Sequence, residues 1–125
     1  MEYSIKKTVL LAEDDEDARE IARVILELYG YEVIEAVDGV SLLHKSMEVN
    51  PDIVILDLSL TPGGGIQLML QLRKNVVFST VPVLAYTAMS SIDDMEMLKR
   101  EGFDGVIPKP CKPEEIVDTV RKFVG

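Results

Sequence analysis

Acidic side chains stand at two points where an apolar run of the sequence ends. Five consecutive acids, residues 13–17, follow one short apolar run, and Asp57 closes a run of four aliphatic residues. Two further runs are closely followed by the hydroxyl of Thr87 and the ammonium of Lys109. Oxygen ligands without His or Cys favour Mg²⁺, Mn²⁺ or Ca²⁺ over zinc. Brought together, these groups would suit Mg²⁺ held beside a phosphate group.

Carboxylates that lie close together repel one another, so such a site needs compensating positive charge. Two negative charges about 4 Å apart repel by roughly 4 kcal/mol at an effective dielectric of about 20. Lys109 offers one cation, and a divalent metal ion would supply the rest. Solvation alone does not explain Asp57, because it ends an otherwise aliphatic run. Residues 15–17, in contrast, are expected only to cap the next helix and to complement its dipole.

Short apolar runs alternate with amphipathic stretches along the chain. The runs predict strands at residues 8–12, 33–34, 53–57, 81–86 and 106–107. The stretches predict five helices: one that stops at Gly30, one capped by Asp38 and ended by Pro51, one at residues 66–73, one from Ser90 or Ser91 to Gly102, and a last one from Pro113. This alternation predicts a doubly wound α/β fold with a five-stranded parallel sheet, because parallel strands covered on both faces are apolar throughout.

The predicted helices should bury apolar residues that recur at helical spacing. The expected buried positions are Ala18, Ile21, Ala22, Ile25, Leu28 and Tyr29 in the first helix, Val40, Leu43 and Met47 in the second, and Ile116, Val117, Val120 and Phe123 in the last. The carboxyl ends of parallel strands meet at one edge of a sheet, where ligands bind. This edge would bring together the side chains of Glu13, Asp14, Asp57, Thr87 and Lys109.

Composition limits the class of protein. The 125 residues have the length of one domain, and no repeat or linker divides residues 1–125. A net charge of −9 without a cluster of Lys or Arg argues against direct binding of nucleic acid. No apolar run approaches the roughly 20 residues of a membrane span, and the first seven residues lack the apolar core of a secretory signal. The single cysteine, Cys111, cannot form an internal disulfide, so a cytoplasmic location is expected.

Four segments together resemble the receiver domain of two-component response regulators. They are residues 9–15, 51–57, 82–88 and 107–110, and each contains a predicted strand end. The resemblance covers essentially the whole chain. It implies a flavodoxin-like (CheY-like) three-layer sandwich with strand order 2-1-3-4-5. It also implies a signalling domain that accepts a phosphoryl group.

The resemblance assigns a role to each polar residue at the sheet edge. Asp57 corresponds to the phosphoacceptor. Glu13 and Asp14 correspond to the acidic pair that holds Mg²⁺ together with Asp57 and the main-chain carbonyl of Ser59. The phosphoryl donor implied is a phosphohistidine on a histidine kinase or a histidine phosphotransfer protein.

The remaining roles concern contacts to the phosphoryl group. Thr87 corresponds to a switch hydroxyl, and Ala88 offers its main-chain amide to the phosphoryl oxygens. Lys109 corresponds to the cation at this group, and its bond to Pro110 to a cis peptide bond. Such a domain catalyses only its own phosphorylation and dephosphorylation, so it is a switch and not an enzyme with free turnover.

The domain is expected to control a downstream protein or an output domain that is missing from this chain. The sequence is therefore compatible with a stand-alone regulator and with one part of a longer protein. The resemblance implies that the face formed by the fourth helix, fifth strand and fifth helix contacts a target or forms a homodimer, and the sequence leaves the two open. Two positions depart from the family pattern. Thr61 stands where a proline is usual, followed by Pro62 and three glycines that should make the loop mobile. Val106 replaces the usual aromatic residue, so output should depend mainly on Thr87.

Two other functions are compatible with the same architecture. One is an adaptor that works without phosphorylation, which would need none of the polar residues above. The other is a metal-dependent phosphatase, which would need a second general acid, and Leu58, Ser59 and Leu60 supply none. His44 and Cys111 are expected to be a solvent-facing residue and an inert one, respectively.

Overall fold

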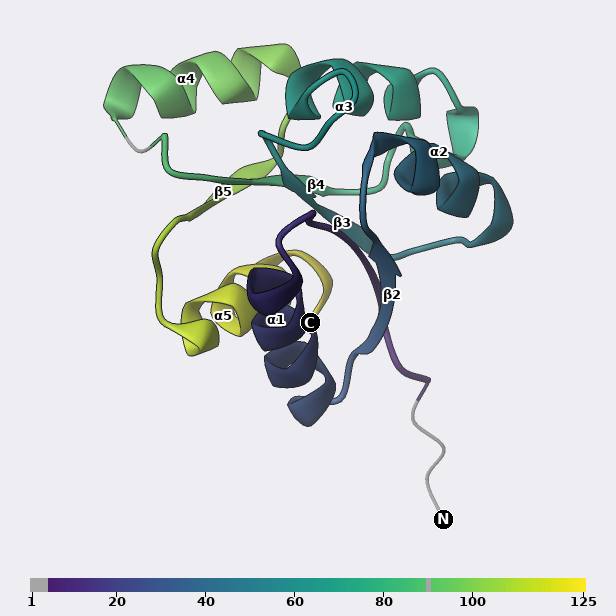
Figure 1. Cartoon of the computed structure of the whole chain (residues 1–125), viewed down its shortest axis with the longest axis vertical. Coiled ribbons are helices and arrows are strands. Elements are labelled where there is room, and N and C mark those ends of the chain that lie inside the picture. Colours follow the sequence, from purple (N-terminus) through teal and green to yellow (C-terminus); the bar gives the residue numbers. More distant parts are fainter. Residues whose placement is uncertain (1–4, 90) are drawn as a thin grey trace.

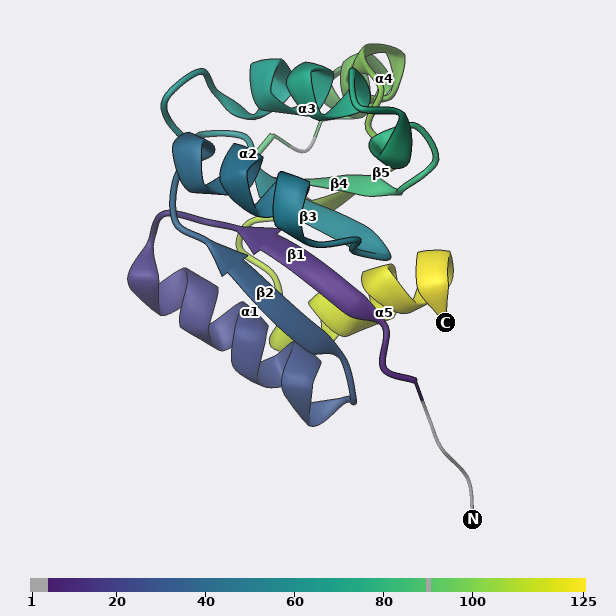
Figure 2. The same ribbon diagram turned by 90° about the vertical axis from the view of Figure 1, so that its right-hand side faces the viewer.

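A five-stranded parallel sheet forms the middle layer of the protein (Figure 1, Figure 2). The computed structural model describes residues 5–89 and 91–125. The strand order is β2-β1-β3-β4-β5, as the resemblance implies. The elements are β1 (Thr8–Ala12), α1 (Glu16–Leu28), β2 (Glu32–Ala36), α2 (Gly39–Glu48), β3 (Ile53–Asp57), α3 (Gly65–Arg73), the 3-10 turn η1 (Val76–Phe78), β4 (Val83–Thr87), α4 (Ile92–Glu101), β5 (Gly105–Pro108) and α5 (Pro113–Val124).

Helices cover the sheet on both faces, as Figure 1 shows: α1 and α5 lie on one face, and α2, α3 and α4 lie on the other. Alternate strand residues point to opposite faces, so each strand contributes to two hydrophobic cores. Leu10 and Leu56 pack under α2, α3 and α4, whereas Leu11 and Ile55 pack under α1 and α5. The predicted doubly wound fold is therefore confirmed.

Capping side chains set the helix starts. Asp15 is the N-cap of α1 and accepts a hydrogen bond from the Ala18 amide at 2.8 Å, as predicted. Asp38 caps α2 and Ser91 caps α4. Ser90, which was predicted as the other possible cap of this helix, lies outside the described residues. Residues 1–4, part of the N-terminal segment that was predicted not to be a secretory signal, also lie outside them. β1 and β3 have the predicted bounds, α5 begins at the predicted Pro113, and the ends of the other strands differ from the predicted ones by one or two residues.

The predicted buried face of α1 is partly wrong. Ala22 and Leu26 are fully buried, whereas Ile21 and Leu28 are 53% and 75% exposed. Residues four apart lie on one helix face, so the pair 22 and 26 marks the narrow stripe that the sheet covers. Tyr29, at 49% exposure, lies at the C-cap of the helix and also outside this stripe.

The predicted buried face of α2 is also only partly right, because Leu43 is partly buried against the core but its two predicted companions are not. Val40 and Met47 are 51% and 73% exposed, whereas Leu42 and Ser46 are buried. Burial of a serine is tolerated here because its hydroxyl donates a hydrogen bond to the Leu43 carbonyl at 2.6 Å. Periodicity alone therefore identified the helix but not its rotation about its own axis.

Close packing surrounds the end of the glycine-rich loop after β3, where the loop joins α3. The amide of Gly65 donates a hydrogen bond to the Leu58 carbonyl at 2.9 Å. A Cβ atom on Gly65 would lie 2.6 Å from the Leu58 Cα and 2.9 Å from the Asp57 carbonyl oxygen. On the other side, the amide of Gly39 at the start of α2 donates to the Thr61 carbonyl at 2.8 Å. The greater mobility expected of this loop remains a prediction.

Substitution of Gly65 by alanine should therefore destabilise the fold. We expect the free energy of unfolding to fall by about 2 kcal/mol, because backbone atoms on the Asp57 loop must move to admit the methyl group. Urea denaturation followed by circular dichroism measures the change. Gln67→Ala, at an exposed position of the same helix, is the matched control. A loss no greater than that of the control would contradict the prediction.

Candidate functional site

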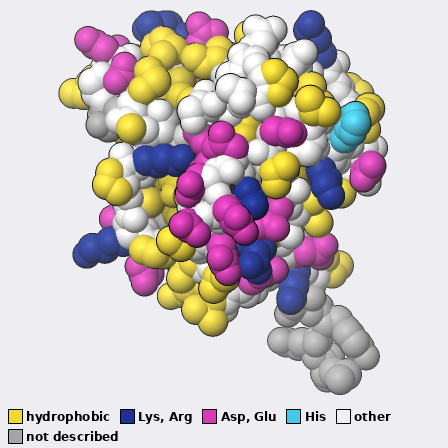
Figure 3. Space-filling model, in the orientation of Figure 1, with side chains coloured by type: hydrophobic (Ala, Val, Ile, Leu, Met, Phe, Trp, Pro, Cys, Tyr) yellow, Lys and Arg dark blue, Asp and Glu magenta, His cyan; other side chains and the backbone are white. Residues whose placement is uncertain are grey.

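The polar residues predicted to converge do meet at the carboxyl edge of the sheet. Glu13 directly follows β1, Asp57 and Thr87 are the last residues of β3 and β4, and Lys109 directly follows β5. In Figure 3, acidic side chains gather near the middle of the visible face. The strand ends position these side chains because β1, β3, β4 and β5 are hydrogen-bonded neighbours within the sheet.

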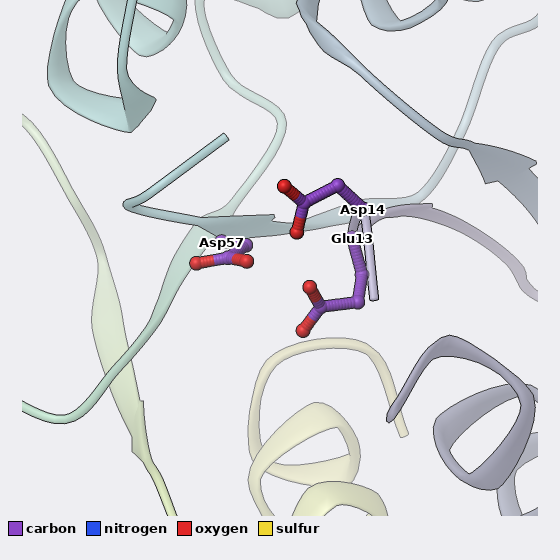
Figure 4. Close-up of side chains that lie close together, drawn as sticks. All are labelled: Glu13, Asp14 and Asp57. Atoms are coloured by element: carbon purple, nitrogen blue, oxygen red, sulfur yellow. The ribbon is translucent and has the colours of Figure 1, made fainter. Parts of the chain in front are cut away.

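Three carboxylates form the acidic cluster. Figure 4 shows that the side chains of Glu13, Asp14 and Asp57 point toward a common space. One carboxylate oxygen from each residue lies within 4.8 Å of the others. Glu13 and Asp57 are 0% and 3% exposed, whereas Asp14 is exposed. A set of oxygen donors that includes two buried acids is chemically suited to a hard divalent cation.

Lys109 supplies the positive charge within this cluster. Its Nζ lies 2.6 Å from Glu13 Oε1 and 3.4 Å from Asp57 Oδ2. Its main-chain amide donates a hydrogen bond to the Thr87 carbonyl at 2.8 Å, which ties the residue to the end of β4. The Lys109–Pro110 bond is cis, as expected, and Thr61–Pro62 is also cis.

Ser59 fixes the orientation of the Asp57 carboxylate. Both its amide and its hydroxyl donate hydrogen bonds to Asp57 Oδ1, each at 2.9 Å. Asp57 Oδ2 is the oxygen that faces Lys109. The family resemblance pointed only to the carbonyl of Ser59, and the hydroxyl contact was missed. The sequence could have indicated this contact, because an aspartate side chain commonly accepts a hydrogen bond from the residue two positions later in a turn.

Main-chain contacts hold Glu13 in place. Its Oε2 accepts a hydrogen bond from the Asp15 amide at 3.2 Å, and its carbonyl accepts one from Arg19 Nη1 at 3.0 Å. The Glu13 amide donates to the Ala36 carbonyl at 3.1 Å, which extends the β1–β2 pairing by one residue. Sequence reasoning missed Arg19, because its contact requires the first turn of α1 to fold back over the end of β1.

Thr87 lies beside a cavity of about 360 Å³ next to the acidic cluster. Its side chain is buried, and its Oγ1 accepts a hydrogen bond from the Met89 amide at 3.0 Å. Ala88 is exposed. The residues that line the cavity are Asp57, Leu58, Ser59, Thr87, Ala88, Met89 and Lys109. A small anionic group in this cavity would have Asp57 and Lys109 on its walls.

The two buried acids differ in pKa. Burial and the facing Asp57 carboxylate raise the pKa of Glu13 to about 7. Burial also acts to raise the pKa of Asp57, but hydrogen bonds from Glu13 and Ser59 outweigh it and hold that pKa below its usual value. Burial acts to lower the pKa of Lys109, but the carboxylates of Glu13 and Asp57 outweigh it and raise that pKa. Of the two buried acids in the metal-free cluster, Glu13 is therefore the one that takes up a proton first as the pH falls.

This proton should make the stability of the metal-free protein depend on pH. A carboxyl whose pKa rises on folding contributes stability below its unfolded pKa, and this contribution is lost as the pH rises through the folded pKa. As the pH rises from 4.5, the ordinary pKa of a glutamate, to about 7, the Glu13 contribution should thus decline. We expect a decline of roughly 1–3 kcal/mol in the free energy of unfolding, measured by urea denaturation in EDTA. Glu13→Gln should remove it, and an unchanged pH profile in that variant would contradict the assignment.

Parallel order 2-1-3-4-5 with an acidic cluster at the carboxyl edge defines a receiver-type domain. The family model of the response regulator receiver domain matches residues 9–121, so the chain belongs to this family of two-component signalling proteins. The predicted resemblance is confirmed for both family and fold. Among curated relatives, the polar-differentiation response regulator DivK of Brucella ovis is 28% identical over 119 residues, which cover 95% of this chain and 97% of that protein.

Solved structures give the same result. The chemotaxis response regulator CheY4 of Vibrio cholerae superposes with a TM-score of 0.92 at 26% identity, covering 96% of this chain and 100% of that chain. The receiver domain of the Francisella response regulator 1452 superposes with a TM-score of 0.87 at 25% identity, covering 94% of this chain and 96% of that chain.

Other residues singled out in the sequence lie apart from the acidic cluster. His44 is exposed, as predicted. Cys111 is a partly buried free thiol, and burial raises its pKa, which makes it less reactive. Across residues 5–89 and 91–125, no helix combines the length and the apolar character needed to span a membrane.

Proposed function

We propose that this chain is a phosphorylation-dependent signalling switch in which Asp57 accepts a phosphoryl group from the phosphohistidine of a histidine kinase or a histidine phosphotransfer protein. The observation that carries the proposal is the position of Asp57: it is 3% exposed, lines the cavity, and has Lys109 Nζ 3.4 Å from its Oδ2. A buried acid beside a cation and a cavity suits nucleophilic attack on a charged phosphorus centre.

The acidic cluster would hold Mg²⁺. The residues that would bind it are Glu13, Asp14, Asp57 and the main-chain carbonyl of Ser59; the donor set supports this because it consists of oxygen atoms alone. When bound, the ion supplies positive charge that offsets the charge of the phosphoryl oxygens and of the three carboxylates.

Asp57 would act through Oδ2. Ser59 occupies Oδ1 with two hydrogen bonds, so Oδ2 is the oxygen left to attack phosphorus. The new bond joins Oδ2 to phosphorus, the bond from phosphorus to the donor imidazole nitrogen breaks, and the imidazole leaves with the bonding electron pair. Lys109 stabilises the charge spread over the phosphoryl oxygens, for which its ammonium must move away from Glu13.

Thr87 and Ala88 would respond to the phosphoryl group. The Thr87 hydroxyl turns toward a phosphoryl oxygen, and the exposed Ala88 offers its amide to another. The Met89 amide, which donates to Thr87 in the structure, is released by this rotation. With Val106 in β5, the output passes mainly through Thr87 and the loop that follows it.

The proposed context is a single receiver domain at residues 1–125 in the cytoplasm. It acts on a downstream protein or an output domain, without direct contact to nucleic acid or membrane, and it catalyses only its own charging and discharging. A homodimer would use the face formed by α4, β5 and α5. Polar differentiation and chemotaxis, which appear in the names of DivK and CheY4, are processes of those proteins and are not proposed for this chain.

Incubation with acetyl phosphate and Mg²⁺ tests the function. We expect intact-mass spectrometry to show the gain of one phosphoryl group per chain, and EDTA should prevent it. If the mass does not increase and the protein still binds its partner, the result would favour the phosphorylation-independent adaptor. Repeated hydrolysis of p-nitrophenyl phosphate without a stable mass gain would favour the metal-dependent phosphatase.

A further inference from the structure

Tyr86 lies directly beneath the ammonium of Lys109. The Nζ atom is 4.4 Å from the centroid of the tyrosine ring, inside the roughly 6 Å range of a cation–π interaction. In the sheet, Tyr86 is the register partner of Asp57 on β3 and of Ile107 on β5. Register partners in parallel strands place their side chains on the same face, so the ring and the Asp57 carboxylate share one side of the sheet.

The ring is a rigid surface. Tyr86 is 8% exposed and belongs to the core cluster under α1 and α5, where it packs with Ile107 and Ile116. Lys109, in contrast, has a flexible four-carbon stem, and its side chain is 28% exposed. A lysine in this position can adopt many rotamers unless a neighbouring group restricts it.

The carboxylate contacts of Lys109 do not restrict it throughout the reaction. Nζ lies 2.6 Å from Glu13 Oε1, and this contact must lengthen when Nζ approaches a phosphoryl group on Asp57. The attraction of an ammonium to a ring face has no single directional partner, so it persists while Nζ exchanges one oxygen for another.

We propose that Tyr86 is a positioning residue for phosphoryl transfer, whose ring holds Lys109 Nζ over the phosphoacceptor while it exchanges Glu13 for the phosphoryl oxygens. This inference rests on the proposed function of Asp57. The ring face performs the task and the hydroxyl does not, which distinguishes this role from that of a hydrogen-bond donor.

Two substitutions of Tyr86 distinguish the effect of its aromatic ring from the effects of its hydroxyl group and of its apolar volume. Tyr86→Phe keeps the ring and removes the hydroxyl, and its rate of phosphorylation by saturating acetyl phosphate should equal that of the wild type. Tyr86→Leu keeps an apolar side chain and removes the ring, and its rate should fall about fivefold. Equal rates in the leucine variant and the wild type would overturn the proposal, as would equal losses in the phenylalanine and leucine variants.

A double-mutant cycle tests whether Tyr86 acts through Lys109. In a Lys109→Gln background, Tyr86→Leu should cause no further loss of rate, because the group that the ring positions is gone. A further loss of about fivefold in this background would show that Tyr86 acts through packing alone, and would overturn the proposal. Thermal unfolding of each variant identifies any that has lost its fold.

Proton NMR of the unphosphorylated protein provides a measurement that needs no phosphoryl transfer. The methylene protons next to Lys109 Nζ should be shifted upfield by the ring in the wild type and Tyr86→Phe, and the shift should vanish in Tyr86→Leu. Absence of the shift in the wild type would overturn the positioning role. A shift without any phosphorylation of the wild type would instead reject the proposed function and, with it, a role for the ring in transfer.

Discussion

Asp57→Asn should reduce the rate at which the protein takes up a phosphoryl group from acetyl phosphate by at least about 1,000-fold. Removal of the nucleophile of an enzyme reduces the reaction rate by a factor of this size or larger. An amide oxygen is a far weaker nucleophile than a carboxylate oxygen. The asparagine still offers an oxygen to the amide and hydroxyl of Ser59, so the loop after β3 should keep its conformation. Intact-mass spectrometry over a time course, with Mg²⁺ present, measures the rate.

Asp17→Asn is the matched control for this experiment. Asp17 is an exposed acid of the first turn of α1, outside the three-residue carboxylate cluster. We expect this variant to be phosphorylated at the wild-type rate. Labelling of Asp57→Asn at the wild-type rate, with the phosphoryl group located by peptide mapping at another residue, would contradict the assignment of the phosphoacceptor.

Asp14→Asn should have opposite effects on metal binding and on the stability of the metal-free protein. The substitution removes one of three carboxylates whose oxygens lie within 4.8 Å of one another. Because these charges repel, their partial neutralisation should raise the melting temperature in EDTA by about 3 °C. The same change removes a ligand of the proposed Mg²⁺ site, so the affinity for Mg²⁺ should fall at least about tenfold.

Isothermal titration calorimetry measures the affinity, and a thermal scan with and without Mg²⁺ measures the stability. The variant should have a higher melting temperature than the wild type in EDTA, and added Mg²⁺ should raise its melting temperature less than that of the wild type. Asp17→Asn again serves as the control: it should keep the wild-type affinity for Mg²⁺, and it should not melt above the wild type in EDTA because its charge complements the dipole of α1. A lower melting temperature of Asp14→Asn in EDTA would indicate that the Asp14 side chain supports the fold instead.

The sequence predicted the strands more accurately than the buried helix faces, for a physical reason. β1 and β3 are covered on both sides, so an uninterrupted apolar run such as residues 53–56 fits few structures besides a buried strand. A helix buries only one stripe, and apolar residues can extend beyond it. Ile21 and Met47 are such residues, and their exposure depends on how each helix is rotated against the sheet, which is a tertiary property.

The polar residues of the site were predictable as a set, because each stands at or just after the end of an apolar run. Their partners were not predictable in the same way. The contact of Arg19 with the Glu13 carbonyl and the approach of Lys109 to the ring of Tyr86 depend on side-chain directions that the sequence pattern does not define. Tyr86 is typical of a buried strand residue, so its type alone did not mark it as part of the site.

The hydrogen bond from the Met89 amide to Thr87 Oγ1 affects how fast the proposed switch can operate. Loop rearrangement extends to microseconds, which is far slower than the picosecond to nanosecond rotation of a side chain that nothing restrains. Thr87 cannot turn away without leaving a main-chain donor free at the start of the segment that leads to α4. We therefore expect the threonine and this segment to change conformation together in the proposed switch, so that the slower motion of the backbone sets the response time.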